Sequence, residues 1–359
     1  ASYVKIKREE LDVLSNCAKS PLQIGINCTF AELFFEKIRL RDVLRSLWAQ
    51  TACEFESALR PSTKIQWAGQ TIQYHYQRLG FATQEIADGH HIYKGEHNDC
   101  THVLWTSSCQ NAISCLFLSI KKLTSDLQVF APHGGYWESI RFFEKFDFRL
   151  CDSAADGQKY IYFADSSTWK SPLNKDHIEL MHCMAIIADT TCFDRGDPWI
   201  QFWIDTAAEL NKPLFLLRSH LKLDNLGMEL GRLGSVVFKR GLGEDSWEQK
   251  VWSELKAIAP LFGLPAQYSQ IYPILFDKSF CDINSKWITR IENNHRHVLR
   301  SLVHSNAAPF LTTFDHQKYF WVSLPDSFEE VQIQSSIKLL SRLLTFRDLS
   351  HVAISGFWY

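Results

Sequence analysis

Long apolar runs are absent from this sequence of 359 residues. No stretch approaches the ~18 to 20 apolar residues that cross a membrane as a helix, and the segment from Ala1 to Glu10 is charged rather than signal-like. An excess of one charge is also missing, because 38 Lys and Arg stand against 40 Asp and Glu. We therefore expect no membrane span, and neither nucleic acid nor an acidic membrane surface is a favoured partner.

The ten cysteines include no C-x-x-C pair. This absence excludes zinc-finger spacing and the density of a small disulfide-rich secreted scaffold. We expect reduced thiols that pack as small apolar side chains, and hence a cytoplasmic protein. Neither His90-His91 nor His295-Arg296-His297 has cysteines or carboxylates at metal-ligand spacing, so no metal is expected.

Residues 1–85 have a mostly helical pattern. Apolar residues between Phe34 and Trp48 recur mainly at three-to-four spacing, which is typical of an amphipathic helix. We expect an N-terminal helical arm.

Residues 86–245 have a different rhythm, in which short apolar strands alternate with helical stretches. This alternation predicts an α/β fold with a mainly parallel sheet. The large domain is expected here, and its predicted strands are His102–Trp105, Leu127–Phe130, Tyr160–Phe163, Met184–Ala188, Leu214–Leu217 and Ser235–Phe238.

Residues 246–359 suit a separate, smaller α+β domain. Long helices are expected at residues 247–261, 283–303 and 328–344, and strand-like pieces at residues 309–314, 319–324 and 352–357. The apolar end from Ser355 to Tyr359 has the pattern of a strand cut short, so we expect the chain to be part of a longer protein.

Two turns of small residues follow predicted strands. Ser107 to Ile113 opens a helix, and the backbone N–H groups of a helix N-terminus hold phosphate well; N-capping alone would explain the same residues. Pro132 to Tyr136 contains two glycines that let the backbone approach a ligand, and His133, whose ring is suited to lie against a heteroaromatic ring. A plain turn is the alternative for this segment.

An aspartate and a lysine follow two further strands. Asp189 lies where α/β sheets bind ligands, and a carboxylate there would keep a pyridine nitrogen protonated. Lys222 follows the strand Leu214–Leu217, and a lysine in a buried site can act as an amine nucleophile. Taken alone, the aspartate would be a helix cap and the lysine a solvated loop residue. The order of the four signals, each at a predicted strand end, favours one shared site.

The stretch from Thr101 to Val237 resembles fold-type I pyridoxal-phosphate (PLP) enzymes, which have the aspartate-aminotransferase-like fold, and within them the cystathionine lyase and synthase group. That group's Ser-Ser-Gly-Met-Ala-Ala-Ile is similar to residues 107–113, and its Tyr-Gly-Gly-Thr to residues 133–136. Its Glu-Ser-Pro-Thr, Asp-Asn-Thr and Ser-x-Thr-Lys are similar to residues 165–168, 189–191 and 219–222. The resemblance implies an α/β PLP-transferase-like large domain with a smaller α+β C-terminal domain.

The resemblance also implies roles for individual residues. Lys222 would form the internal aldimine, Asp189 would pair with the pyridine nitrogen and His133 would stack on the ring, so these three form the implied catalytic set. The main-chain amides of Cys109 and Gln110 and the hydroxyl of Ser219 would hold the phosphate. The implied cofactor-binding residues are Ser108, Cys109, Gln110, His133, Thr168, Asp189, Thr191, Ser219 and Lys222.

Three positions depart from the family pattern. The family's Asn beside the ring hydroxyl falls on Trp169, and the stacking residue is His, as in many fold-type I decarboxylases. No arginine in front of Ser355-Gly356 matches the one that grips the substrate carboxylate, and Arg347 is the nearest. Because PLP weakens the Cα bond that stands perpendicular to its ring, the missing clamp favours decarboxylation. Side-chain elimination or replacement and transamination are the alternatives.

The implied function is that of a PLP-dependent lyase acting at Cα of an amino-acid group, on a small amino-acid-like substrate or on a peptidyl or natural-product moiety. Enzymes of this resemblance are usually dimers, so a homodimer is expected. Tyr74, Tyr76 and Arg78 loosely resemble a phosphate contact. Two readings of other classes stay open, a catalytically degenerate PLP-fold binding module and a cofactor-free α/β protein, because fold does not fix function.

Overall fold

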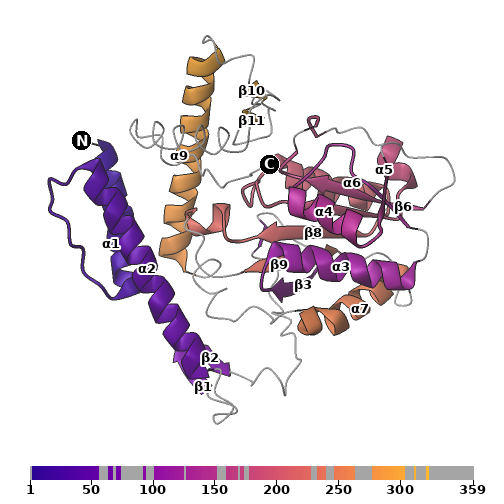
Figure 1. Cartoon of the computed structure of the whole chain (residues 1–359), viewed down its shortest axis with the longest axis horizontal. Helices are drawn as coiled ribbons and strands as arrows, with labels where there is room; N and C mark the ends of the chain where they lie inside the picture. Colours follow the sequence, from indigo (N-terminus) through magenta and orange to yellow (C-terminus); the bar gives the residue numbers. More distant parts are fainter. Residues whose placement is uncertain are drawn as a thin grey trace.

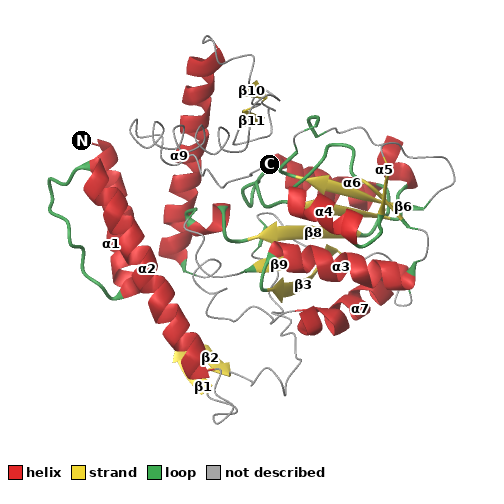
Figure 2. Ribbon diagram, viewed as in Figure 1, coloured by secondary structure: helices red, strands yellow, loops and turns green. Residues whose placement is uncertain are grey.

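The structure of the protein is a computed structural model that describes residues 2–55, 64–67, 70–73, 92–93, 101–124, 127–151, 159–168, 170–173, 178–227, 233–239, 246–262, 277–303, 311–312 and 321–322. A seven-stranded sheet with helices around it forms the larger body of the molecule (Figure 1). The helices belonging to this sheet follow its strands in alternation along the chain, as the ribbon diagram shows (Figure 2).

The strand order of the large sheet is β3-β9-β8-β7-β6-β4-β5. Strands β8, β7, β6, β4 and β5 are mutually parallel, whereas β9 runs antiparallel to both β3 and β8. The mainly parallel α/β sheet expected from the sequence is confirmed. Its strands are β3 (Thr101–Thr106), β4 (Gln128–Phe130), β5 (Arg149–Cys151), β6 (Tyr160–Asp165), β7 (Ala185–Asp189), β8 (Leu214–Ser219) and β9 (Gly234–Lys239).

The edge strand β5 was not predicted. Its first two residues, Arg149 and Leu150, are exposed, so it lacks the apolar run that marks a buried strand. An edge strand of three residues carries too little pattern to be separated from a loop.

Alternate residues of the strands face two hydrophobic layers, as the period of a strand requires. Phe163 and Phe215 pack in one layer with α3, α4 and α7, whereas Tyr162 and Leu216 pack in the other with α6 and α9. Strands covered on both faces have near-continuous apolar sequences, which is why they could be located in advance. The helices are α1 (Ser2–Ala18), α2 (Phe30–Phe55), α3 (Cys109–Leu123), α4 (Trp137–Lys145), α5 (Ile178–His182), α6 (Pro198–Glu209), α7 (Trp247–Phe262) and α9 (Lys278–Val303).

Helix α7 belongs to the layer that covers the sheet. The sequence places residues 246–262 in the small C-terminal domain, but Val251, Trp252 and Leu255 pack in the same core as α3. The Trp252 ring stacks on that of Phe238 in β9, with 5.5 Å between the ring centres and 28° between the ring planes. The apolar face of α7 is therefore buried against the sheet; the division of the chain into domains stays a prediction.

The N-terminal helices α1 and α2 lie side by side away from the sheet (Figure 1). Glu10 of α1 pairs with Arg290 of α9, which links the two regions. The antiparallel strands β1 (Lys64–Trp67) and β2 (Gln70–Gln73) were not expected in the helical arm. A second antiparallel pair, β10 (Leu311–Thr312) and β11 (Trp321–Val322), falls on two strand-like pieces predicted for the C-terminal part. No helix in the described ranges is long and apolar enough to span a bilayer.

Candidate functional site

The carboxyl ends of β3, β4, β6, β7 and β8 meet at one edge of the sheet, because these strands point the same way. Polar residues therefore gather where ligands of α/β sheets bind. The residues that the sequence singled out at this edge are Ser108 after β3, His133 after β4, Thr168 after β6, Asp189 at the end of β7, and Ser219 and Lys222 at and after the end of β8.

Helix α3 begins at this edge with its N-terminus fixed by local contacts. The Ser108 hydroxyl caps the helix by accepting from the Asn111 amide at 3.0 Å, and the Ser107 hydroxyl accepts from the Asn111 side chain at 2.9 Å. Gly234 of β9 lies directly beneath the helix start. A Cβ at Gly234 would stand 2.3 to 2.5 Å from backbone atoms of Ser108 and Cys109, so only glycine allows this approach.

Asp189 and Asp165 form a pair of buried carboxylates in register on β7 and β6. Asp165 accepts from the Tyr136 amide at 2.8 Å and from the amide and hydroxyl of Ser167, both at 2.7 Å. Burial, with the Asp189 carboxylate adding to it, raises the pKa of Asp165 to about 7. Burial also raises the pKa of Asp189.

The direct partners of Asp189 are neutral. The Cys109 thiol donates to one carboxylate oxygen at 3.4 Å, and the Thr191 amide donates to the other at 2.8 Å. Burial and the nearby Asp189 raise the pKa of Cys109 well above its ordinary value, so the group is a thiol that donates. No lysine, arginine or histidine in the described ranges forms an ion pair with Asp189.

Thr191 connects β7 to both neighbouring elements of the site. Its hydroxyl accepts from the Ser219 amide at 2.9 Å and lies 3.9 Å from the Cys109 sulfur. Three residues implied by the resemblance, Cys109, Thr191 and Ser219, are thus brought together beside Asp189.

Lys222 lies three residues past the end of β8 and is half-buried. Its Nζ stands 5.9 Å from the centre of the Tyr136 ring. The Tyr136 amide also binds Asp165, which lies beside Asp189 in the neighbouring strand. Tyr136 therefore lies between Lys222 and the pair of carboxylates. Tyr136 was not among the predicted site residues, although it lies in the predicted turn at residues 132–136.

His133 is buried and engaged at both ring nitrogens. Nδ1 lies 2.8 Å from the Ser171 hydroxyl, and Nε2 lies 3.1 Å from the hydroxyl of Tyr162. Burial lowers the pKa of His133 to about 4, so the ring is neutral at pH 7. Stacking of His133 on a cofactor stays a prediction, and Tyr136 is the aromatic ring found beside Lys222.

The remaining predicted residues are placed as follows. Thr168 is fully buried, and the side-chain oxygen of Gln110 accepts from the Ser139 hydroxyl at 3.5 Å. Trp169, Tyr74, Tyr76, Arg78 and Arg347 lie outside the described residues. Among the described side chains, no group of three or more His, Cys, Asp or Glu could hold a metal ion.

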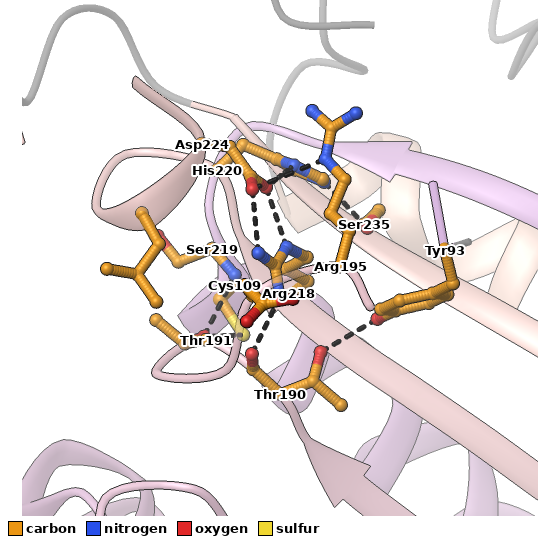
Figure 3. Close-up of polar contacts among 12 residues, drawn as sticks. Tyr93, Cys109, Thr190, Thr191, Arg195, Arg218, Ser219, His220, Asp224 and Ser235 are labelled. Carbon is orange, nitrogen blue, oxygen red and sulfur yellow. Dashed lines mark hydrogen bonds and ion pairs between the residues drawn. The ribbon is translucent and has the colours of Figure 1, made fainter. Parts of the chain in front are cut away.

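A buried polar network supports the segment that carries Lys222 (Figure 3). Its centre is Asp224, which binds Arg218 and His220 and is fully enclosed. The sequence offered one signal for it, since Arg218 is a charged residue that continues the apolar run of β8. Its partner could not be identified from sequence, because the pairing depends on how the chain turns after the strand.

No protein-family model and no curated protein matches the sequence. Among solved structures, an aromatic amino acid aminotransferase of Psychrobacter sp. B6, crystallised with aspartic acid, is similar over 75% of this chain and 73% of its own, with 12% identity and a TM-score of 0.50. An aromatic-amino-acid aminotransferase of Burkholderia pseudomallei, covalently bound to pyridoxal phosphate, is similar over 83% of this chain and 81% of its own, with 12% identity and a TM-score of 0.45.

An aromatic amino acid aminotransferase of Burkholderia cenocepacia is similar over 70% of each chain, with 15% identity and a TM-score of 0.46. At such identities a likeness speaks for the fold alone, and the Psychrobacter structure carries that conclusion. The strand order and mainly parallel sheet agree with it. The chain has the aminotransferase-like fold of PLP-dependent enzymes.

Proposed function

We propose that this protein is a PLP-dependent enzyme that acts on an amino-acid group, with Lys222 as the residue that carries the cofactor. The observation behind the proposal is the convergence at one sheet edge of three features: the N-terminus of α3, the buried Asp189 and the Lys222 amine. Each alone has an ordinary structural explanation. Together they supply groups for a phosphate, a pyridine nitrogen and an aldehyde, which are three of the polar parts of PLP.

The surroundings of Asp189 fit a cationic ring nitrogen. Its carboxylate is buried with a thiol and an amide as direct partners, and Asp165 adds a second carboxylate in the neighbouring strand. A buried carboxylate is costly unless a cation compensates it. A protonated pyridine nitrogen would provide that charge, and Asp189 would hold the proton on it.

The start of α3 fits a phosphate. The first-turn amides of a helix have no partner within the helix, and the helix dipole favours an anion there. Cys109 and Gln110 begin the first turn of α3 and present such amides, and Gly234 approaches the backbone of Ser108 and Cys109 closely. We infer that Cys109 and Gln110 amides, with the Ser219 hydroxyl, hold the phosphate.

PLP, when bound, withdraws electrons from the bonds at Cα of an attached amino acid. The protein's own residues would direct that effect. Lys222, once freed by the incoming amine, would move the proton at Cα as general acid and base. Tyr136, whose ring lies beside the Lys222 amine, would flank the reacting position and keep water away from it.

Transamination is the reaction to test first, since the Psychrobacter structure with this fold is that of an aminotransferase. Decarboxylation is the second candidate, supported by His133 in the stacking position of the family pattern and by the unmatched carboxylate arginine. The likeness to the cystathionine group makes side-chain elimination or replacement the third. Keto acid, CO₂ and ammonia, measured with a panel of amino acids, separate the three.

The cofactor proposal has a direct test. Purified protein incubated with PLP and reduced with borohydride should carry the adduct on Lys222, as found by peptide mass spectrometry, and Lys222→Ala should abolish it. Lys159→Ala is the matched control, because this exposed lysine precedes β6 at the opposite edge of the sheet. An adduct spread equally over surface lysines, or unchanged in Lys222→Ala, contradicts the proposal.

An adduct on Lys222 without turnover of any amino acid would instead support the degenerate binding module.

We also propose a homodimer, by analogy with enzymes of this resemblance, and light scattering of the purified chain tests it. A monomer that is fully active would contradict that part of the proposal.

A further inference from the structure

Lys222 lies at the centre of a five-residue segment whose first and last side chains are joined. Nδ1 of His220 lies 2.6 Å from Oδ2 of Asp224, and both side chains are fully buried. This hydrogen bond, which we call the clasp, therefore joins the chain two residues before the lysine to the chain two residues after it. Movement of His220 relative to Asp224 would stretch or break this contact.

Asp224 is itself anchored to the sheet (Figure 3). Arg218, near the end of β8, donates to both carboxylate oxygens at 2.6 and 2.7 Å. It also donates at 2.7 Å to the carbonyl of Thr190, the residue that follows β7. Arg195 adds a longer contact at 3.3 Å. Burial alone would raise the pKa of Asp224, but the two arginines outweigh it and hold that pKa well below its usual range.

His220 extends the anchor to β9. Its Nε2 lies 2.9 Å from the Ser235 hydroxyl, and its ring packs 5.1 Å from that of Trp105. Burial lowers the pKa of His220 to about 4, so at pH 7 a neutral ring donates from Nδ1 to Asp224 and accepts at Nε2 from Ser235. Ser235, His220 and Asp224 have the connectivity of a hydrolase triad, but all three are buried at or below 1% exposure, which leaves a substrate no access.

The outer side of the segment is held by the chain and by α9. The Lys222 carbonyl accepts from the Asn225 and Gly227 amides, at 3.3 and 3.0 Å. Asn284 of α9 accepts from the Leu226 amide at 3.0 Å and donates to the Leu223 carbonyl at 2.8 Å. The inner clasp and these outer contacts hold the backbone around Lys222 from both sides.

We propose that His220 and Asp224 are positioning residues for Lys222, a role that rests on the proposed function of that lysine. The clasp holds the amine at the carboxyl edge beside Tyr136 by fixing the backbone on both sides of it. Neither side chain touches the reacting atoms. A 1 Å displacement of a catalytic group can lower the rate about a hundredfold. A hydrogen bond that keeps the Lys222 amine in place would therefore contribute to the rate.

Two substitutions at His220 separate this role from simple packing. In His220→Asn the amide nitrogen takes the place of Nδ1, so the bond to Asp224 is kept. In His220→Gln the amide nitrogen takes the place of Nε2, so only the contact with Ser235 is kept. Packing alone predicts that the smaller Asn is worse. Ser119→Ala controls for loss of a buried hydrogen bond elsewhere, because the fully buried Ser119 hydroxyl donates within its own helix, to the Cys115 carbonyl.

The first measurement is the rate at which borohydride traps PLP on Lys222, with the fraction of adduct at other lysines as reference. A hydrogen bond to a charged group supports a roughly tenfold loss in His220→Gln, with His220→Asn and Ser119→Ala within about twofold of the native protein. Equal losses in the Asn and Gln variants, or a larger loss in Asn, would overturn the positioning role.

The second measurement needs no cofactor, so it separates the two proposals. Hydrogen exchange at the Asn225 and Gly227 amides, both bonded to the Lys222 carbonyl, should be faster in His220→Gln than in His220→Asn. If native protein takes up no PLP at Lys222, the proposed function fails, and this exchange result still decides whether the clasp orders the segment. Equal exchange in both variants would overturn it.

Discussion

Gly234→Ala tests whether the start of α3 is the phosphate site. The new Cβ would stand 2.3 Å from the Ser108 carbonyl carbon, 2.4 Å from the Cys109 nitrogen and 2.5 Å from the Ser108 oxygen, where ordinary contact begins at 3.4 Å. All three are backbone atoms, so no side chain can rotate away. Either β9 or the helix start must move by about 1 Å, and overpacking of this kind costs about 1–3 kcal/mol.

The same shift would misplace the amides proposed to hold the phosphate. A hydrogen bond to a charged group contributes about 1.5–3 kcal/mol, so loss of one corresponds to at least a tenfold rise in Kd for PLP. Pyridoxal, which lacks the phosphate, should be affected much less. Affinities for both compounds, from absorbance titration, together with Tm give the comparison.

Gly25→Ala is the matched control, because a Cβ at Gly25 meets nothing within 4 Å. We expect its Tm and both affinities to equal those of the native protein. Unchanged PLP affinity in Gly234→Ala, or an equal loss for PLP and pyridoxal, would refute the phosphate assignment.

Three further substitutions test the carboxylates and the core. The pKa of Asp165 is about 7, against 3.8 for a free side chain, so the folded protein binds this proton more tightly than the unfolded chain does. The stability that this group contributes is therefore present at low pH and is lost as pH rises through about 7. Asp165→Asn should therefore flatten the fall in Tm of the cofactor-free protein between about pH 4 and pH 7, and an unchanged slope contradicts the shift. Asp189→Asn should raise the Tm of the cofactor-free protein, since it removes a buried charge, whereas the affinity for PLP should fall on the order of tenfold. A fall in both the Tm and the PLP affinity would argue against a pyridine partner. Trp252→Ala should lower the free energy of unfolding by about 3–5 kcal/mol if α7 is part of the sheet core, and denaturant unfolding that leaves the sheet transition in place would contradict this packing.

The strands of the sheet were determined locally. Segments such as Ile161–Ala164 and Leu214–Leu217 are apolar at every position because both faces of a parallel sheet are covered, and this needs no partner to be recognised. Small or charged residues, Asp189 and Lys222 among others, lie at or after the ends of such strands. Because parallel strands end at the same edge of a sheet, these residues could be placed at one edge from the sequence. The fold class and the positions of β3, β4, β6, β7, β8 and β9 therefore followed from the sequence, whereas β5 did not. The roles of the site residues stay a prediction.

Tertiary structure decided what depends on pairs of residues far apart in the chain. The carboxylate pair exists because β6 and β7 place Asp165 and Asp189 in register, and a shift of one residue would send one of them to the other face. The antiparallel direction of β9, the approach of Gly234 to α3 and the contact of His220 with Ser235 likewise arise where different strands of the sheet meet. A local pattern records which residues are buried, whereas partners, distances and hydrogen-bond geometry are fixed only when the chain is packed.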